Sequence, residues 1–167
     1  MKNVLLIVLL AVSLTGWTQK TANDYFDQAI LKAEKGNTQG AITDYTKAIK
    51  LNPKFAEAYL NRAVERIKVN NLTGALSDAN MTLKLNSLLT DAYTTIANID
   101  YKLKDYDKTI KDCDMAISVN SKDHISYNLR ALSYVHINDK KKACSDFTKA
   151  IELGSSSAFQ NRKTFCK

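Results

Sequence analysis

Residues 22–55 read ANDYFDQAILKAEKGNTQGAITDYTKAIKLNPKF, and the pattern of this stretch returns three more times along the chain. Three columns of identical residues recur every 34 positions: Tyr25, Tyr59, Tyr93 and Tyr127; Ala29, Ala63, Ala97 and Ala131; Asp44, Asp78, Asp112 and Asp146. A strict period of this length is typical of a solenoid, in which each unit packs only on its neighbours. We therefore expect a protein that presents an extended surface rather than one chemical pocket.

Each unit carries the signals of two helices, because apolar residues such as Tyr93, Ala97 and Tyr101 recur at helical spacing. Residues that tolerate left-handed backbone follow each expected helix: Gly36, Asn70, Lys104 and Asn138 after the first, and Asn52, Asn86, Asn120 and Gly154 after the second. The residues placed to cap the second helices are Asn37, Asn71, Asp105 and Asp139. Pro53 suits the first turn of the next helix. The pattern predicts first helices near 22–35, 56–69, 90–103 and 124–137, and second helices near 38–51, 72–85, 106–119 and 140–153.

The order of these residues resembles the tetratricopeptide-repeat (TPR) family. The first unit shows the family pattern in Tyr25, Ala29, Gly36, Ala41, Tyr45, Ala48 and Pro53, although tyrosine replaces the usual tryptophan. The resemblance implies an all-α fold, a right-handed α-solenoid of four 34-residue helix-turn-helix repeats. These repeats span residues 22–55, 56–89, 90–123 and 124–155. Residues 156–167 repeat part of the first-helix pattern and are predicted to form a C-terminal capping helix.

The resemblance also implies a concave groove, lined by the first helices, that holds a peptide segment. The residues at the corresponding positions are Phe26, Ile30, Leu60, Val64, Ile67, Asn98, Tyr101, Asn128, Leu132 and Val135. Lys68, Lys102 and His136 are expected at its rim. The alternative is that some of these side chains only pack against the neighbouring first helix.

The aspartate column allows two interpretations. The four acids could form a row that binds a ligand, or they could form ion pairs that connect adjacent units. The pairing hypothesis predicts Asp44–Arg62, Asp112–Arg130 and Asp146–Arg162, and it leaves Asp78 without a partner because Ile96 holds the equivalent place.

Three cysteines have different expected states. Cys113 stands in a column of core aromatic residues and is expected to be buried and free. Cys144 and Cys166 are candidates for a disulfide that would fix the terminal helix, and the alternative is two free thiols. Without nearby histidines, the three cysteines are poor zinc ligands, and we expect no metal site.

Residues 1–18 have the layout of a signal peptide, with Lys2 in a short basic start, an apolar run over 4–12, and small or polar residues before Thr18. This layout predicts an exported protein that is periplasmic or secreted. The alternative is an uncleaved segment that anchors the chain to the membrane, although the apolar run is short for a spanning helix.

The sequence contains no recognisable catalytic constellation. His124 and His136 are the only histidines, and no phosphate-binding loop or hydrolase motif occurs. We expect no enzymatic activity, no cofactor and, despite a net charge of +7, no nucleic-acid partner for an exported chain. The favoured function is a protein–protein interaction adaptor of the cell envelope. The alternatives are a self-associating structural module, hence a homo-oligomer, and a basic surface that binds an acidic envelope polymer.

Overall fold

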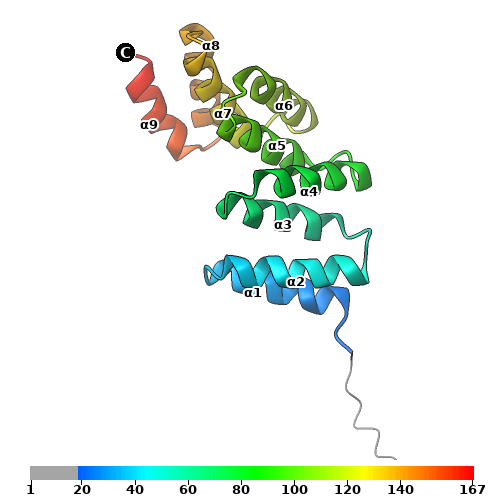
Figure 1. The fold of residues 1–167 in the computed structure, drawn as a ribbon. Coiled ribbons are helices and arrows are strands. Elements are labelled where there is room, and N and C mark those ends of the chain that lie inside the picture. Colours follow the sequence, from blue (N-terminus) through cyan, green and yellow to red (C-terminus); the bar gives the residue numbers. More distant parts are fainter. Residues whose placement is uncertain (1–18) are drawn as a thin grey trace, which may run out of the picture.

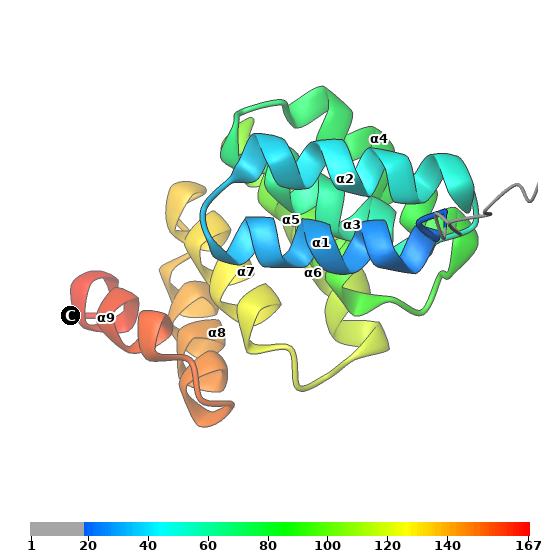
Figure 2. The ribbon, with the colours of Figure 1, turned by 90° about the horizontal axis from the view of Figure 1, so that it is seen from below.

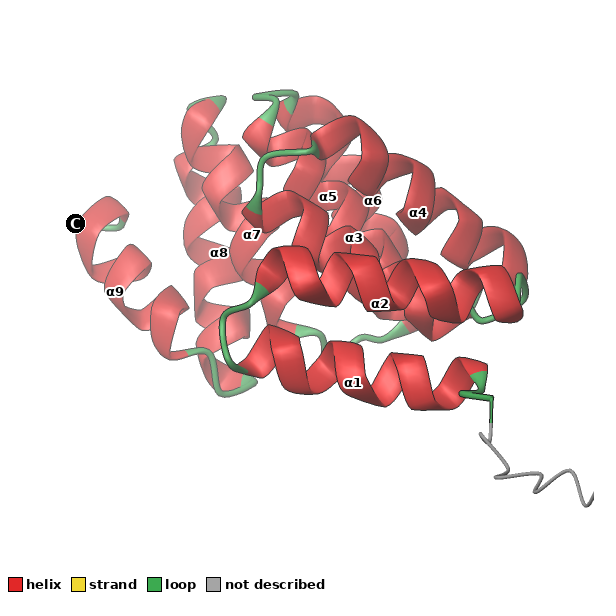
Figure 3. Ribbon diagram, turned by 60° about the horizontal axis from the view of Figure 1, so that its bottom comes forward, coloured by secondary structure: helices red, strands yellow, loops and turns green. Residues whose placement is uncertain are grey.

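The computed structural model describes residues 19–167, so the predicted signal peptide at 1–18 lies outside the described residues. The described part is helical throughout and contains no strand (Figure 3). Its helices are α1 (Ala22–Glu34), α2 (Thr38–Leu51), α3 (Ala56–Lys68), α4 (Leu72–Leu85), α5 (Thr90–Lys102), α6 (Tyr106–Val119), α7 (His124–His136), α8 (Lys140–Glu152) and α9 (Ser156–Phe165). Every helix predicted from the sequence is confirmed; the ends of α1 to α8 agree to within one residue, and α9 ends two residues before the predicted limit.

The helices stack as a solenoid of four pairs followed by a single helix (Figure 1). Each odd-numbered helix packs on the even-numbered helix that follows it, and each pair contacts the next pair. The odd-numbered helices also contact one another in series, α3 with α5, α5 with α7, and α7 with α9. Viewed from below, α1 and α2 lie side by side, and the later pairs are turned relative to them (Figure 2). This is the predicted all-α, right-handed solenoid of helix-turn-helix repeats.

Small residues form the seams between the helices. Each of the following side chains is fully buried: Ala29, Ala63, Ala97 and Ala131 in the first helices, and Ala41, Ala75, Thr109, Ala143, Ala48, Thr82, Ala116 and Ala150 in the second. A methyl or hydroxyl group at these positions lets the helix backbones approach closely. The strict alanine column of the sequence therefore reports helix contact.

The turn inside each repeat has the predicted conformation. Its first residue has a positive φ in all four repeats: Gly36 at 74°, Asn70 at 59°, Lys104 at 64° and Asn138 at 62°. The next side chain accepts a hydrogen bond from the backbone N–H three residues later in each case, as in Asn37, Asn71, Asp105 and Asp139. These caps satisfy backbone donors that the helix cannot pair internally.

The turn between repeats differs from the prediction. Only Gly154 is left-handed there, with φ of 96°. The equivalent asparagines have extended backbone: Asn52, Asn86 and Asn120, with φ of −132°, −149° and −135°. Each accepts a hydrogen bond from the backbone N–H two residues later, and this local turn replaces a left-handed residue. Pro53 lies in that turn, before α3 begins at Ala56.

The predicted pairing of Asp44 with Arg62 is wrong. The Arg62 guanidinium forms two hydrogen bonds with Asp78 of its own repeat, with Nη2–Oδ1 at 2.7 Å and Nε–Oδ2 at 2.9 Å. It also donates to Thr46 of the preceding repeat, with Nη1–Oγ1 at 2.9 Å. Asp44 pairs instead with Lys32 and Lys47.

The other two predicted pairs, Asp112–Arg130 and Asp146–Arg162, are also wrong. Arg130 contacts Asp146 of its own repeat at 2.7 Å and Asp114 of the preceding repeat at 2.5 Å. Arg162 donates to Thr148. Residues two apart on a helix do not share a face. The position that meets the next repeat is therefore two residues beyond the aspartate column, and the aspartate faces its own repeat.

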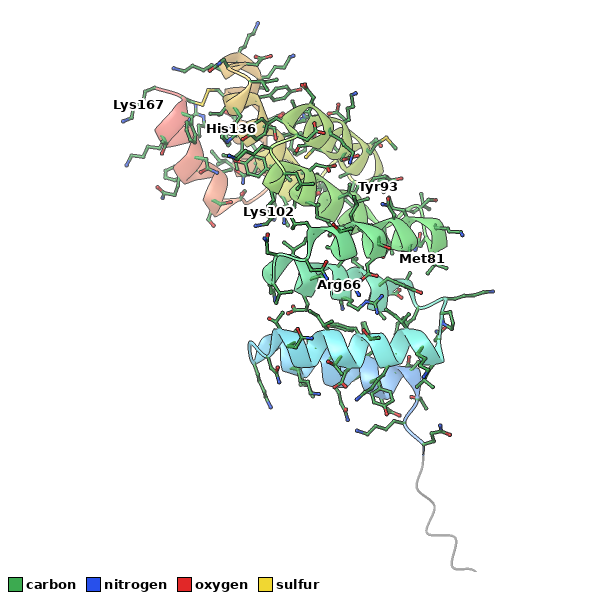
Figure 4. All side chains as sticks on the ribbon, in the orientation of Figure 1. Arg66, Met81, Tyr93, Lys102, His136 and Lys167 are labelled. Carbon is green, nitrogen blue, oxygen red and sulfur yellow. A yellow bond between two sulfur atoms is a disulfide. The ribbon has the colours of Figure 1, made fainter. Side chains whose placement is uncertain are left out.

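Cys144 and Cys166 form a disulfide with an S–S distance of 2.04 Å, which joins α8 to the end of α9 (Figure 4). The sequence allowed either this disulfide or two free thiols, and the structure contains the disulfide. Cys113 is free and buried, as expected, and burial raises the pKa of its thiol. Among residues 19–167, no helix has both the length and the apolar character that crossing a bilayer requires.

Candidate functional site

Three adjoining cavities lie along the first helices. The first, about 240 Å³ in volume, lies between α1 and α3 and extends to α2. Its lining residues are Ile30, Ala33, Glu34, Tyr45, Asn61, Val64 and Glu65.

The second cavity, of about 210 Å³, shares Asn61 and Val64 with the first. Its other lining residues are Leu60, Asp91, Thr94, Thr95 and Ile125. The third cavity, of about 240 Å³, shares Thr94, Thr95 and Ile125 with the second and adds Asn98, Asn128 and Leu129. Because neighbouring cavities share walls, they form one depression across α1, α3, α5 and α7, which we call the groove.

The structure brings half of the predicted lining residues into the groove: Ile30, Leu60, Val64, Asn98 and Asn128. Ile67 packs instead against a buried cluster of the second and third repeats, and Leu132 against one of the fourth repeat and α9. The Phe26 ring packs on Phe55 and Tyr45, with centroids 4.7 Å and 5.7 Å away. For these three side chains, the packing alternative describes the observed contacts.

The remaining predicted residues lie at the C-terminal ends of the first helices (Figure 4). Tyr101 Oη lies 3.1 Å from His136 Nε2, and the Tyr106 ring stacks on His136 at 4.3 Å. Val135 lines a separate cavity of about 300 Å³ beside Phe165. The residues expected at the rim are exposed: Lys68, Lys102 and His136. Lys68 also contacts Glu65.

Two groove residues that sequence reasoning missed have a signal in the repeat columns. Glu65 is the only charged member of a column that holds Leu31, Ile99 and Ser133. Ile125 is the only apolar member of a column with Asn23, Glu57 and Asp91, and it is 55% exposed. In both cases, a residue whose type differs from the equivalent residues of the other repeats lies in the groove.

The charge of the groove is acidic. Its charged lining residues are Glu34, Glu65 and Asp91, and within the described residues no lysine, arginine or histidine lines it. Burial raises the pKa of the Tyr45 hydroxyl, and the charges of Glu65 and Glu34 add to this effect. Tyr45, Glu34 and Glu65 line the same cavity.

Polar groups around the third cavity are held by hydrogen bonds. Thr94 Oγ1 donates to Asp123 Oδ2 at 2.9 Å, and Asn128 Oδ1 accepts from Asn161 Nδ2 at 3.0 Å. The second contact links α7 to the capping helix α9. Fixed amide and hydroxyl groups beside an apolar wall can hydrogen-bond an extended backbone without large rearrangement.

A basic cavity of about 370 Å³ lies apart from the groove, where α1 begins and α2 ends. The Lys20 and Lys47 ammonium groups lie 5.7 Å and 5.1 Å from the centre of the Tyr25 ring, and Lys50 completes the basic lining. No cluster of three or more histidine, cysteine, aspartate or glutamate side chains suited to a metal ion occurs within residues 19–167.

Comparison with known proteins agrees with this architecture. Residues 31–64 match a family model described as TPR repeat, and residues 125–153 match one described as tetratricopeptide repeat. Together with the fold, these matches support a tetratricopeptide-repeat protein. No curated protein sequence matches the chain.

Several solved structures share the fold at low sequence identity. A MamA crystal structure aligns over 82% of this chain and 80% of its own, with 21% identity and a TM-score of 0.74. A thermophilic TPR protein of Thermus thermophilus aligns over 80% and 75%, with 17% identity and a TM-score of 0.73. The first TPR domain of Spaghetti, solved with an HSP90 peptide, aligns over 71% and 94%, with 20% identity and a TM-score of 0.68.

Proposed function

We propose that this chain is a non-enzymatic adaptor that binds an extended segment of a partner protein in the groove. The observation that carries the proposal is the continuity of the three cavities, which share lining residues across α1, α3, α5 and α7. A bound segment would contact every repeat, so its affinity would come from several modest contacts rather than one deep pocket.

The side chains of the groove suit this role. Val64 is 40% exposed and Ile125 is 55% exposed, so each offers apolar surface to a ligand. Asn61, Asn98 and Asn128 supply amide groups that can pair with a peptide backbone. The Spaghetti domain, which was solved with a peptide, has a similar fold and supports segment binding by this architecture.

We further propose that the protein acts outside the cytoplasm, in the cell envelope. The apolar run of residues 4–12 supports export, and the Cys144–Cys166 disulfide suits an oxidising compartment. N-terminal sequencing of the protein from its native cells would test cleavage after Thr18. An intact Met1 on a membrane-bound protein would favour the anchored alternative.

A displayed library of random nonapeptides tests the groove directly. We expect the chain to enrich a defined sequence class, and Val64→Arg to weaken binding of the selected peptide by at least about tenfold, because the new side chain fills the junction of two cavities. Met115→Arg is the matched control, since Met115 is 48% exposed on α6 and lies outside the groove.

Equal losses in both variants would contradict the proposal, as would unchanged binding by Val64→Arg. A chain that selects no peptide but gains mass with concentration in light scattering would instead support the self-associating module. Binding of polyanions that salt abolishes would support the basic-surface alternative.

A further inference from the structure

The groove has the opposite charge to the rest of the protein. The whole chain has 24 lysine and arginine residues against 17 aspartate and glutamate residues. The charged groups that line the groove are nevertheless all carboxylates, in Glu34, Glu65 and Asp91. A surface that faces a ligand with only negative charge favours a ligand with positive charge.

Glu65 is the acid that packing alone explains least. It is 3% exposed and lines the first cavity beside Val64. Its Oε1 accepts a hydrogen bond from Lys68, whereas its Oε2 is buried and has no hydrogen-bond partner among the described residues. A buried carboxylate oxygen that accepts no hydrogen bond lowers the stability of the free protein. A ligand that donates a hydrogen bond to this oxygen removes that cost, and this favours binding.

We propose that the cavity between α1 and α3 receives a lysine or arginine side chain of the bound segment. This inference rests on the proposed function and names the residue that the groove selects. The methylene stem would pack on Ile30 and Val64, and the cationic head would lie between Glu34 and Glu65. The cavity is about 240 Å³, which accommodates one long side chain.

Lys68 weakens the preference of the cavity for a basic ligand side chain, because it already contacts Glu65. Its ammonium group already occupies one oxygen of Glu65, but half of its side chain is exposed to solvent. It therefore partly neutralises the cavity and competes with an incoming cation. Removing its charge with Lys68→Met strengthens the binding of a basic ligand, whereas removing a carboxylate weakens it.

The experiment uses the full chain and fluorescent nonapeptides built on the sequence that the display library selects. Each position is fixed in turn as arginine, its neutral isostere citrulline, lysine or norleucine. We expect one position to prefer arginine over citrulline, and lysine over norleucine, by about tenfold, the size of one charge-assisted hydrogen bond. Glu34→Gln and Glu65→Gln reduce this ratio to about threefold or less, and Lys68→Met increases it.

Glu57→Gln, at an exposed position on α3 outside the groove, is the control and leaves the ratio unchanged. Because Glu65 is buried, its variant is accepted only with an unchanged helical circular dichroism spectrum, and the exposed Glu34 carries the test otherwise. Peptides that bind without a basic preference, or a preference that survives both glutamate variants, overturn this inference and leave the groove function standing. A chain that binds no peptide overturns both.

Discussion

Asp112 on α6 has a raised pKa, first because its carboxyl group is buried and second because the carboxyl group of Asp100 on α5 faces it across the third repeat. In the other repeats, a cation of the first helix pairs with the aspartate of the second: Lys32 with Asp44, Arg62 with Asp78, and Arg130 with Asp146. The third repeat lacks this cation because Ile96 and Asp100 occupy the two basic positions. Asp100 pairs instead with Lys108 of α6, at 2.9 Å, whereas Asp112 Oδ2 is buried without a hydrogen-bond partner among the described residues.

The first prediction is that Asp112 makes the protein less stable as pH rises from about 4 to about 7. Burial, followed by the contact with Asp100, raises the pKa of Asp112 from 3.8 to about 7; Lys108 opposes the increase and Asp105 adds to it. The folded chain therefore keeps a proton that the unfolded chain releases between these values. The contribution is complete below about pH 4 and is lost as pH rises to about 7.

Asp112→Asn isolates this effect in thermal unfolding followed by circular dichroism. The neutral amide cannot ionise, so we expect the variant to gain roughly 1 kcal/mol over the wild type at about pH 8 and to lose most of the slope between about pH 4 and pH 7. Asp107→Asn, an exposed position on the same helix, is the control and should retain the slope. A wild-type curve that rises with pH over this range would contradict the raised pKa of Asp112.

The second prediction concerns Arg62, which connects the first two repeats. Arg62→Met removes two hydrogen bonds to Asp78 and one to Thr46, and it leaves a buried carboxylate with Arg66 as its remaining ion-pair partner. We expect a loss of about 3 kcal/mol in the free energy of unfolding, measured in urea. Asp114→Ala breaks the exposed contact of the equivalent Arg130 and should cost less than about 1 kcal/mol. Similar losses in the two variants would contradict the expectation that the buried Arg62 contacts stabilise the protein more than the exposed contact of Asp114.

The third prediction is that reduction of the Cys144–Cys166 disulfide loosens α9 and spares the repeats. The bridge joins residues at a sequence separation of 22, for which the chain-entropy model gives about 3 kcal/mol. Hydrogen exchange of the amides of α9 should accelerate after reduction, while those around the buried Ala97 keep their protection. Uniform acceleration along the chain would show that the bridge stabilises the whole solenoid instead.

Much of the fold is readable from the period alone. The columns of Ala29 and Tyr25 fix which residues are equivalent, and helix capping at Asn37 then locates each helix end. The period does not say which turn of a helix meets the next repeat. The Arg62 partners were therefore misassigned by two residues, since Thr46 rather than Asp44 faces the neighbour.

The groove is only partly readable for a related reason. Leu60 lines the groove as expected from its position in the first helix, whereas Phe26 occupies the equivalent place in the first repeat but packs on Phe55. Whether a side chain at a groove position reaches solvent depends on the size of its neighbours, which the repeat pattern does not specify. Glu65 escaped notice because it stands in a column that elsewhere is uncharged.

The most direct test of the account is to map where a selected nonapeptide binds, using backbone amide chemical shifts of the labelled chain. We expect the largest shift changes along the groove, at Val64, Thr94, Asn98 and Asn128 on α3, α5 and α7. Changes concentrated on the outer helices α4, α6 and α8, or around the basic cavity beside Tyr25, would show that the groove is not the binding surface.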